Sequence, residues 1–305
     1  MRSGFSSKNV FPPDFSQVLK SRHKILSKIR NFFNARDYLE VETPVMVKCP
    51  GIDPYIEPIS SGEAYYLSTS PELHMKRLLS VGIDNIYQIA RAFRSEESGD
   101  LHNHEFTILE WYRTGSDYKD IMLETEALIA FVFDADGLDK KKINTPFKRI
   151  TVDELYEKAA GWQPSTKWDE DRYFRDWAEK VDPYLKTANA VFVMDFPAPL
   201  SALSKIKDNG RVCERFELYM QGVEIANAYS ELTGVAGHEN YFKKALKRRE
   251  ELGKEKYDID GGFMDAVNRG IPESGGIALG IDRLVMLLLN KNKIEDVIAF
   301  PEIRL

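Results

Sequence analysis

Apolar residues near the start of the chain recur with a helical period. Between residues 15 and 36 they fall on one face every seven residues, as at Val18, Ile25 and Phe32, and Arg22 joins this face through its aliphatic stem. This pattern predicts a long opening helix that gives way at Asp37. The segment YLEVETPVM that follows is alternating and β-branched, and Pro44 confines it to a sheet edge or an interface strand.

Two alternating segments, residues 84–97 and 106–113, flank a polar loop that contains a glycine. This arrangement predicts antiparallel strands joined by a long loop. Side-chain alternation places one set of the second strand on a common face: Phe106, Ile108, Glu110 and Tyr112. Leu109 and Trp111 then point the other way, into the core.

A second hairpin is predicted in residues 214–232, with Gln221-Gly222 as a two-residue turn. Tyr219 then lies opposite Glu224, and Glu217 shares their face. Strict alternation would turn the side chains of Asn227, Tyr229 and Glu231 to the opposite face from Glu224. We therefore predict a bulge near residues 225–226 that brings both sets to one site.

The remaining segments indicate helices around these hairpins. Residues 114–210 are largely helical in pattern and end in an apolar strand, so this stretch is expected to be an insertion or a set of peripheral helices. Residues 275–291 form a glycine-broken strand that runs into a strongly apolar helix. The chain contains no internal repeat and no low-complexity segment.

Composition narrows the class of protein. The 305 residues are 43% hydrophobic and 30% charged, as in an ordinary globular protein. Cys49 and Cys213 stand far apart without a CxxC neighbour, which favours a reducing cytoplasm over a disulfide or zinc framework. Without a long apolar run, secretion and membrane spanning are not expected.

The net charge of −6 argues against a surface that holds nucleic acid by neutralising phosphates, and the basic run at 243–256 is interpreted as a solvated helix face.

The first hairpin has the residues of a nucleotide site. Arg94 offers a guanidinium for a phosphate, Phe106 offers a ring for a base, and histidines occupy the connecting loop. The alternative is a surface ion pair between Arg94 and Glu96 or Glu110.

Two further groups of residues suggest a ligand that carries phosphates. Glu217 and Glu224 are like charges on one face and need a cation, for which Mg²⁺ with substrate phosphates is the natural occupant; the alternative is a pair of solvent-facing glutamates. Gly276 and Gly280 permit a ligand to approach the backbone, and Arg283 can reach a second phosphate. An ordinary arginine at the start of a helix is the alternative for Arg283.

Three separated segments resemble, in order, the three signature motifs of class II aminoacyl-tRNA synthetases. DYLEVETPVM resembles motif 1, FRSEES with HNHEFTILEWY resembles motif 2, and GIALGIDRLVML resembles motif 3. SPELHMKRLL, ERFELY and EIANAYSELT resemble the lysyl-tRNA synthetase catalytic domain. Since only some 16 residues precede the first helix, an anticodon-binding OB-fold is not expected. The chain thus resembles the truncated paralogue family of elongation factor P lysyltransferases, also known as (R)-β-lysine ligases.

The resemblance implies an α+β fold with a mostly antiparallel sheet flanked by helices. Residues 1–16 would be an N-terminal extension and residues 17–305 the catalytic domain, in which residues 114–210 form a largely helical peripheral segment. Asp37 stands where motif 1 usually has glycine. Motif 1 builds a two-fold interface in this class, so a homodimer with Pro44 near its seam is implied.

Roles carried over from the family divide the candidate residues into three groups. For ATP, Arg94 would hold the α-phosphate, Glu96 the base amino group, His102 and Asn103 the triphosphate and adenine, Phe106 the stacked base, and Arg283 the γ-phosphate, with Glu217 also at the nucleotide. For Mg²⁺, the ligands would be Glu217 and Glu224. For the amino acid, the pocket would contain Glu72, Glu110, Tyr112, Asn227, Tyr229 and Glu231, with Ser70 and Ala278 bearing on which lysine isomer fits.

The activity implied is ATP-dependent formation of an adenylate of lysine or (R)-β-lysine, then transfer to a lysine side chain of elongation factor P. Several carboxylates with no buried lysine among them would suit a substrate with two ammonium groups. Stable nucleic-acid binding is not expected. Two alternatives stay open: a catalytic-core ligase that acts on tRNA or a small molecule, and an inactive paralogue that senses amino acid or nucleotide.

Overall fold

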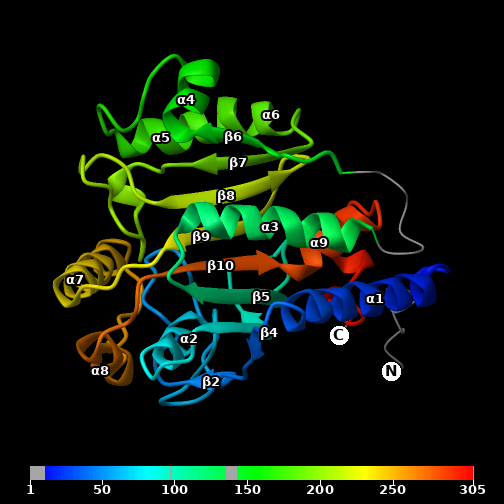
Figure 1. Ribbon diagram of the computed structural model, residues 1–305, viewed down its shortest axis with the longest axis horizontal. Coiled ribbons are helices and arrows are strands. Elements are labelled where there is room, and N and C mark those ends of the chain that lie inside the picture. Colours follow the sequence, from blue (N-terminus) through cyan, green and yellow to red (C-terminus); the bar gives the residue numbers. More distant parts are fainter. Residues whose placement is uncertain (1–10, 97, 135–142, 305) are drawn as a thin grey trace, which may run out of the picture.

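The structure, a computed structural model, describes residues 11–96, 98–134 and 143–304. Within these residues, eight strands form one sheet in the order β1-β4-β5-β10-β9-β8-β7-β6, and β2 pairs with β3 in a small second sheet (Figure 1). The pairs β1–β4 and β6–β7 are parallel and the other neighbours are antiparallel. The strands are β1 (Leu39–Glu40), β2 (Met46–Val47), β3 (Tyr66–Leu67), β4 (Asn85–Phe93), β5 (Glu105–Thr114), β6 (Lys148–Thr151), β7 (Ala190–Met194), β8 (Arg215–Met220), β9 (Val223–Ser230) and β10 (Ser274–Gly280).

Helices surround this sheet, so the predicted α+β class with a mostly antiparallel sheet is confirmed. The α-helices are α1 (Phe15–Asn34), α2 (Glu72–Leu79), α3 (Tyr118–Phe133), α4 (Val152–Ala160), α5 (Glu170–Asp176), α6 (Asp182–Leu185), α7 (Val235–Glu251), α8 (Gly261–Arg269) and α9 (Ile281–Leu288). Short helical turns are η2 (Trp177–Val181), η3 (Ala198–Leu200), η4 (Ile294–Asp296) and η5 (Glu302–Arg304). The first ten residues of the predicted N-terminal extension lie outside the described residues, and α1 begins at Phe15.

Both predicted hairpins form. β4 pairs with β5, and β8 pairs with β9 through Gln221 and Gly222, whose φ angles of 53° and 79° are those of a two-residue hairpin turn. Tyr219 lies opposite Glu224, but Leu218 lies opposite Ala226, so Ile225 is an extra residue in β9. The predicted bulge is therefore confirmed at this point.

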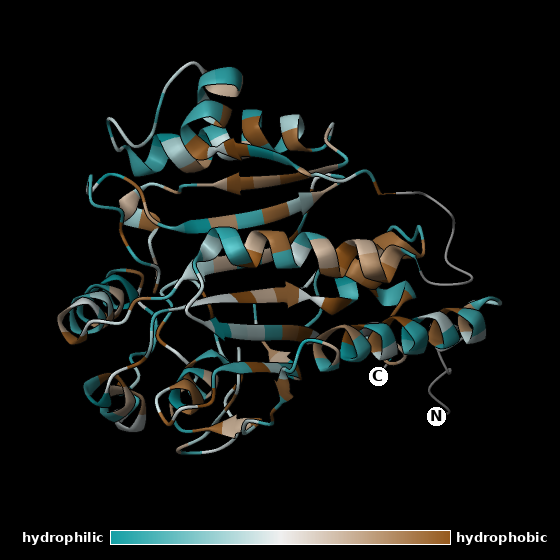
Figure 2. Ribbon diagram, viewed as in Figure 1, coloured by the Kyte–Doolittle hydropathy of each residue, from teal (hydrophilic) through white to brown (hydrophobic). Residues whose placement is uncertain are grey.

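The main core lies on one face of the sheet under α1, α3 and α9. Leu109 and Trp111 of β5 are buried in it, as the alternation of side chains along the strand predicted. Ile277 and Leu279 of β10 are buried beside them. In Figure 2 hydrophobic residues gather where α3, α9 and β10 meet. The other face of β5, β9 and β10 therefore remains available for polar side chains.

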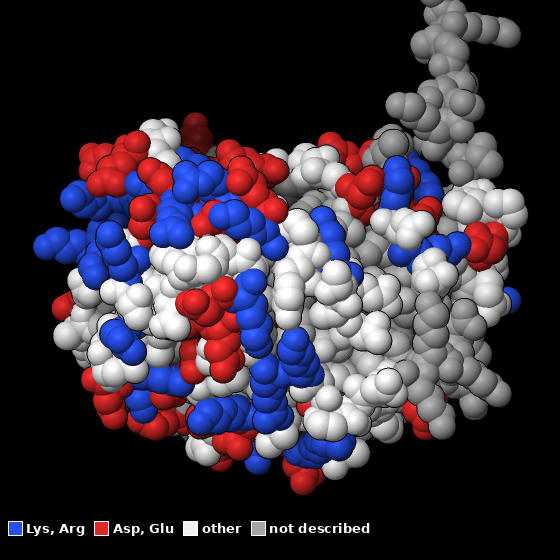
Figure 3. Space-filling model, turned by 90° about the horizontal axis from the view of Figure 1, so that it is seen from above, with Lys and Arg blue, Asp and Glu red and all other residues white. Residues whose placement is uncertain are grey.

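The segment expected to be peripheral contributes to two different parts of the fold. Its first helix, α3, packs against β8, β9 and β10 within the main core. β6 and β7 extend the sheet, and α4, α5 and η2 cover its outer end with a separate apolar cluster. Over this end, Figure 3 shows acidic and basic side chains interspersed, and Asp176 pairs with both Arg172 and Lys180.

The segment that resembles motif 1 divides between the two sheets. β1 lies at the edge of the large sheet beside β4, whereas β2 pairs with β3, and Pro44 lies between them. Asp37 has φ of 57°, a left-handed conformation that aspartate tolerates better than most residues and that glycine adopts without strain. Among the described helices, none combines the length and apolar character needed to cross a bilayer.

A buried ion pair joins the opening helix to the closing one. The Arg22 guanidinium lies 2.6 Å from Asp282 Oδ1 and donates to Thr107 Oγ1 at 2.9 Å, while the Thr107 N–H donates to Asp282 Oδ2 at 2.7 Å. The sequence analysis predicted that the aliphatic part of Arg22 packs on the buried face of the helix, but it did not predict the ion pair of the guanidinium group. Since Asp282 precedes Arg283, this pair fixes the start of α9 against β5.

Replacing Arg22 with methionine should lower the free energy of unfolding by about 3 to 5 kcal/mol, because Asp282 would remain buried without a counter-ion. Chemical unfolding followed by circular dichroism measures this loss. The double variant Arg22→Met with Asp282→Asn removes both charges and should recover much of the stability. A single variant as stable as the double would contradict this account.

Candidate active site

A cavity of ≈ 270 Å³ opens on the polar face of β5, β9 and β10. It is also lined by α2, by the start of α9 and by the loops that follow β2 and β4. The structure brings the following predicted site residues to its wall: Ser70, Glu72, Arg94, His102, Asn103, Phe106, Glu110, Tyr112, Glu224, Asn227, Tyr229, Glu231, Ala278 and Arg283. Residues nearly two hundred positions apart in the sequence thus face one space.

One end of the cavity is cationic, and we call Arg94 and Arg283 its arginine end. The Arg94 guanidinium lies 5.1 Å from the centre of the Phe106 ring. Arg283 donates to the Glu224 carbonyl at 2.9 Å and to the Leu101 carbonyl at 3.3 Å. These backbone contacts fix the Arg283 side chain before any ligand binds.

The other end is acidic, and we call Glu72, Glu110 and Glu231 its carboxylate end. Glu110 is 1% exposed and accepts hydrogen bonds from Ser70 Oγ and from the Tyr112 hydroxyl at 3.1 Å. Burial, aided by the neighbouring Glu72 charge, raises the pKa of Glu110 to about 8. Ser70, predicted to bear on isomer choice, therefore also orients a carboxylate.

A buried lysine within the carboxylate end corrects the sequence analysis, which expected none. Lys76 is 0% exposed, and its Nζ lies 2.6 Å from Glu72 Oε1 and 2.5 Å from Glu231 Oε2. Desolvation acts to lower the pKa of Lys76, but its pairs with Glu231 and Glu72 outweigh this and raise it. The ammonium thus stays charged and offsets one carboxylate.

Gly276 is needed for a different reason from the one predicted. A Cβ on Gly276 would collide with Glu231 Oε1 and with the Tyr112 ring, so the protein's own side chains occupy the space that was assigned to a ligand. At Gly280 a Cβ would make only ordinary contact, 3.7 Å from Arg283 Cδ. Gly276 therefore lets the carboxylate end close over β10.

The two predicted magnesium ligands differ in their surroundings. Glu217 does not line the cavity: it pairs with Arg215 at 2.5 Å and accepts from the Tyr219 hydroxyl at 2.6 Å. Glu224 does line it, and although 42% of its side chain is open to solvent, the cavity walls desolvate it and with Glu217 raise its pKa to about 7.

No cluster of three or more potential metal ligands occurs within the described parts of the chain. A carboxylate with a raised pKa beside a second carboxylate still fits a divalent cation whose remaining ligands are phosphate oxygens and water. Glu224 would then contact the ion directly, with Glu217 behind it.

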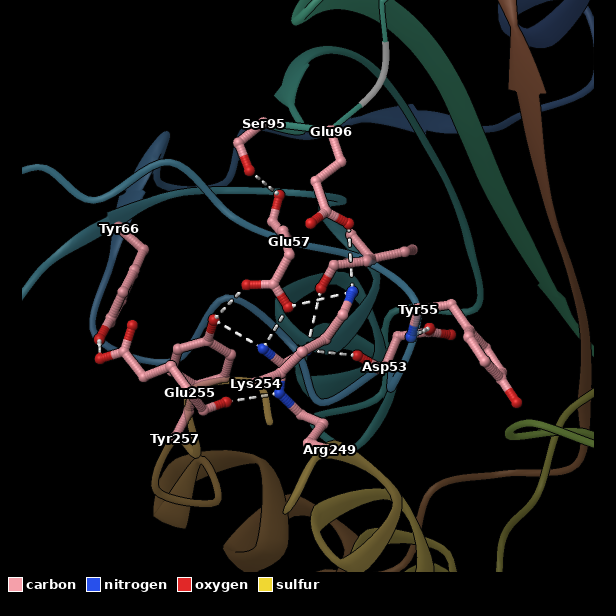
Figure 4. A network of polar contacts seen from close by, with 11 residues as sticks. Asp53, Tyr55, Glu57, Tyr66, Ser95, Glu96, Arg249, Lys254, Glu255 and Tyr257 are labelled. Carbon is pink, nitrogen blue, oxygen red and sulfur yellow. Dashed lines mark hydrogen bonds and ion pairs between the residues drawn. The ribbon is translucent and has the colours of Figure 1, made fainter. Parts of the chain in front are cut away.

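Glu96 lies away from the cavity, in the network shown in Figure 4. Its carboxylate pairs with Lys254 Nζ at 3.1 Å and is largely exposed. Lys254 also lies 3.4 Å from Glu57, which pairs with the fully buried Arg249 at 2.6 Å. Arg249 donates to the carbonyls of the loop that carries Asp53, and the Ser95 N–H donates to the Glu57 carbonyl at 2.9 Å. This network ties the loop between β2 and β3 to the loop after β4.

Several residues of the site were missed from the sequence. Asp53 lines the cavity, Arg215 holds Glu217 and donates to Asn227 Oδ1 at 3.1 Å, and Lys76 holds two glutamates. Lys76 follows Glu72 by one helical turn, a spacing that could have suggested their pairing. Arg215 and Glu217 are two residues apart on one strand and share a face, so side-chain alternation could have predicted that they lie side by side. Asp53 gives no comparable signal.

Comparisons with known proteins agree with this geometry. Residues 8–304 match the family of class II tRNA synthetases (D, K and N). The chain is 39% identical to an elongation factor P (R)-β-lysine ligase of Yersinia enterocolitica, with 93% of this chain and 94% of that protein covered. Proteins of the same name from Proteus mirabilis and Vibrio cholerae are 39% and 38% identical, over 94% and 93% of this chain and 95% and 94% of their own lengths.

Gly276→Ala should displace the Glu231 carboxylate and the Tyr112 ring and abolish the thermal stabilisation that lysine gives, while stabilisation by ATP persists. We expect a loss of about 1 to 3 kcal/mol of stability from the overpacking. Thermal unfolding with each ligand measures both effects. Gly280→Ala on the same strand is the matched control, and an equal loss in both variants would show that the contacts at Gly276 are not special.

Replacing Glu110 with glutamine should change how stability depends on pH. Because the pKa of Glu110 is about 8 in the fold and 4.5 ordinarily, its stabilising contribution is complete below pH 4.5 and is lost as pH rises to 8. Relative to wild type, Glu110→Gln should therefore gain about 1.4 kcal/mol per pH unit over this window. Urea unfolding between pH 5 and 8 tests this, with Glu105→Gln at the exposed start of β5 as control. Parallel pH profiles for wild type and Glu110→Gln would refute it.

Proposed function

The chain belongs to the class II aminoacyl-tRNA synthetases and, within them, to the elongation factor P (R)-β-lysine ligase family, and from this we infer an ATP-dependent ligase. It activates lysine or (R)-β-lysine as an aminoacyl-adenylate and transfers it to a lysine side chain of elongation factor P. The observation that carries this proposal is the polarity of the cavity. Its arginine end suits a triphosphate, and its carboxylate end suits an amino acid with two ammonium groups.

ATP would lie along the arginine end. Arg94 faces the α-phosphate, the Phe106 ring stacks beneath adenine, and Arg283 clamps the nucleotide with His102 beside it at 2.6 Å. Asn103 borders the triphosphate and adenine. Mg²⁺ held directly by Glu224, with Glu217 behind that residue, would supply positive charge for the phosphates.

The substrate amino acid would lie at the carboxylate end, with Asn227, Tyr229 and Tyr112 completing the pocket. The Asn227 amide donates to the Tyr229 hydroxyl at 3.0 Å, which leaves its carbonyl for Arg215. Ala278 adds one methyl group to the floor. In a closed pocket a change of this size shifts discrimination by roughly 1 to 3 kcal/mol, and with Ser70 it favours the β isomer that the relatives' names specify.

Activation needs no general base, because the substrate carboxylate is already a nucleophile. Its oxygen attacks the α-phosphorus, the bond to the β-phosphate bridging oxygen breaks, and pyrophosphate leaves. Arg94 and Arg283 stabilise the charge that develops on the phosphates. In the second step an acceptor ε-amino group attacks the adenylate carbonyl carbon and AMP leaves.

The acceptor is proposed to be elongation factor P in the cytoplasm, because relatives that are over 37% identical are named elongation factor P (R)-β-lysine ligases. A homodimer is proposed through the segment that resembles motif 1. Leu39, Val45 and Met46 are exposed apolar residues on either side of Pro44, and a two-fold contact would bury them.

The intact mass of elongation factor P, after incubation with enzyme, ATP and either lysine isomer, tests this function. We expect a gain of one lysyl residue, larger in extent with (R)-β-lysine. Arg94→Ala should reduce amino-acid-dependent pyrophosphate exchange by roughly 10²- to 10³-fold, the cost of losing one preorganised donor. Arg91→Ala, which removes an exposed arginine of β4 three residues before Arg94, is the matched control and should exchange normally.

Three outcomes would count against the proposal. Efficient charging of tRNA, with the factor's mass unchanged, would favour the tRNA ligase alternative. Binding of ATP and lysine without exchange would favour a sensor. Normal exchange by Arg94→Ala would refute the role given to that residue.

A further inference from the structure

Lys76 is a buried charged residue, and the stability of the fold does not explain why a charge is buried at this position. α2 turns its side chain inward, where it is 0% exposed and pairs with Glu72 and Glu231. Burying ions costs several kcal/mol each, and a buried ion pair is often no more stable than apolar residues of the same volume. The arrangement therefore points to a role at the cavity that both glutamates line.

The charge balance of the carboxylate end depends on this lysine. Burial raises the pKa of Glu231 to about 7, and Lys76 acts against this rise. Without the ammonium, the carboxylates of Glu72 and Glu231 would be like charges with no cation between them, which favours the protonated form of Glu231, the more deeply buried of the two. A neutral carboxylic acid is a poor partner for a substrate ammonium.

The geometry also leaves room for a ligand. Lys76 contacts Oε1 of Glu72 and Oε2 of Glu231. The other Glu231 oxygen lies over Gly276, on the cavity floor. Among the described residues, none makes a hydrogen bond or ion pair with Oε2 of Glu72 or Oε1 of Glu231, so each carboxylate keeps one oxygen for an ammonium group.

We propose that Lys76 is a positioning residue for the amino-acid substrate: it holds the carboxylates of Glu72 and Glu231 in place so that their remaining oxygens receive an ammonium group. This inference rests on the proposed function. Glu110 is largely protonated near pH 7, and Glu231, whose pKa is about 7, ionises as a substrate ammonium group binds beside it. Two carboxylates and one ammonium then leave a net charge of −1, which matches the single net positive charge of lysine. Specificity for a dibasic amino acid is then a property of the whole cluster.

Other titratable groups surround this cluster and enter its pH dependence. They are Asp53 before α2, Glu110 and Tyr112 on β5, Tyr229 on β9, and His238 and Tyr241 on α7. Desolvation raises the pKa of each tyrosine and lowers that of His238, so these four stay neutral near pH 7. Glu231 is then the group whose ionisation the loss of Lys76 affects most directly.

Pyrophosphate exchange with the full chain tests the proposal by separating the KM for lysine from that for ATP. Lys76→Met should raise the lysine KM at least about 30-fold at pH 7, the scale for breaking a buried charge pair, while the ATP KM stays within about twofold. The lysine deficit should shrink between pH 7 and pH 9, because loss of Lys76 moves the ionisation of Glu231 to higher pH. Lys76→Arg keeps the charge and should recover most of the lysine affinity.

The control is Lys186→Met, which removes an exposed ion pair of the same i, i+4 spacing from α6 and should change neither KM. If Lys76→Met does not fold, Lys76→Gln, which keeps a hydrogen-bond donor but removes the charge, replaces it, with the same selective rise expected. An unchanged lysine KM, or equal rises in both KM values at both pH values, would overturn the proposal. Wild-type enzyme without lysine-dependent exchange would instead refute the proposed function.

Discussion

One extra residue in β9 determines which side chains share the cavity. Ile225 has no partner on β8, so alternation restarts there and Glu224 faces the same way as Asn227, Tyr229 and Glu231. Without the bulge, a regular ladder would turn Glu224 toward the core side of the sheet. The arginine end would then lose its neighbouring carboxylate. The bulge costs a ladder contact, and the apolar side chain of Ile225 offsets this by packing into the main core.

Differences in burial and in nearest partner distinguish the carboxylates of the site from one another. Glu217 is held by Arg215 and Tyr219 and is not offered to the cavity, whereas Glu224 faces it with a raised pKa. At the other end Glu110 is kept largely protonated near neutral pH, and Glu72 and Glu231 share the Lys76 ammonium. In the proposed function, the same residue type would thus serve as a structural anchor, a cation ligand and a substrate contact, because burial and nearest partner differ at each position.

The sequence predicted features that depend on local periodicity. The opening helix followed from its seven-residue period, and both hairpins followed from alternation of apolar and polar positions. The bulge followed from the hypothesis that Glu224 shares a site with Asn227, Tyr229 and Glu231, which strict alternation would prevent. What it could not predict depends on partners distant in sequence: Glu96 meets Lys254, and Arg22 meets Asp282. Lys76 was missed because a charged side chain is normally expected to be exposed to solvent. Its burial is favourable only because the fold brings Glu231 close to α2, so that two carboxylates pair with the ammonium. The split of the motif 1 segment between two sheets likewise needs the positions of β3 and β4.

The network around Arg249 divides into a fixed half and an adjustable half. Arg249 is fully buried and makes contacts with Glu57 and with the loop carbonyls near Asp53, so breaking them would strand a charge in the interior. The Glu96 to Lys254 pair is exposed, and such pairs contribute only about 0 to 1 kcal/mol. A nucleotide amino group can therefore draw Glu96 from Lys254 at little cost, while Arg249 keeps the loop between β2 and β3 in place. The position of Glu96 outside the cavity is thus compatible with its predicted role at adenine, because the contact that holds it there is among the weakest in the network.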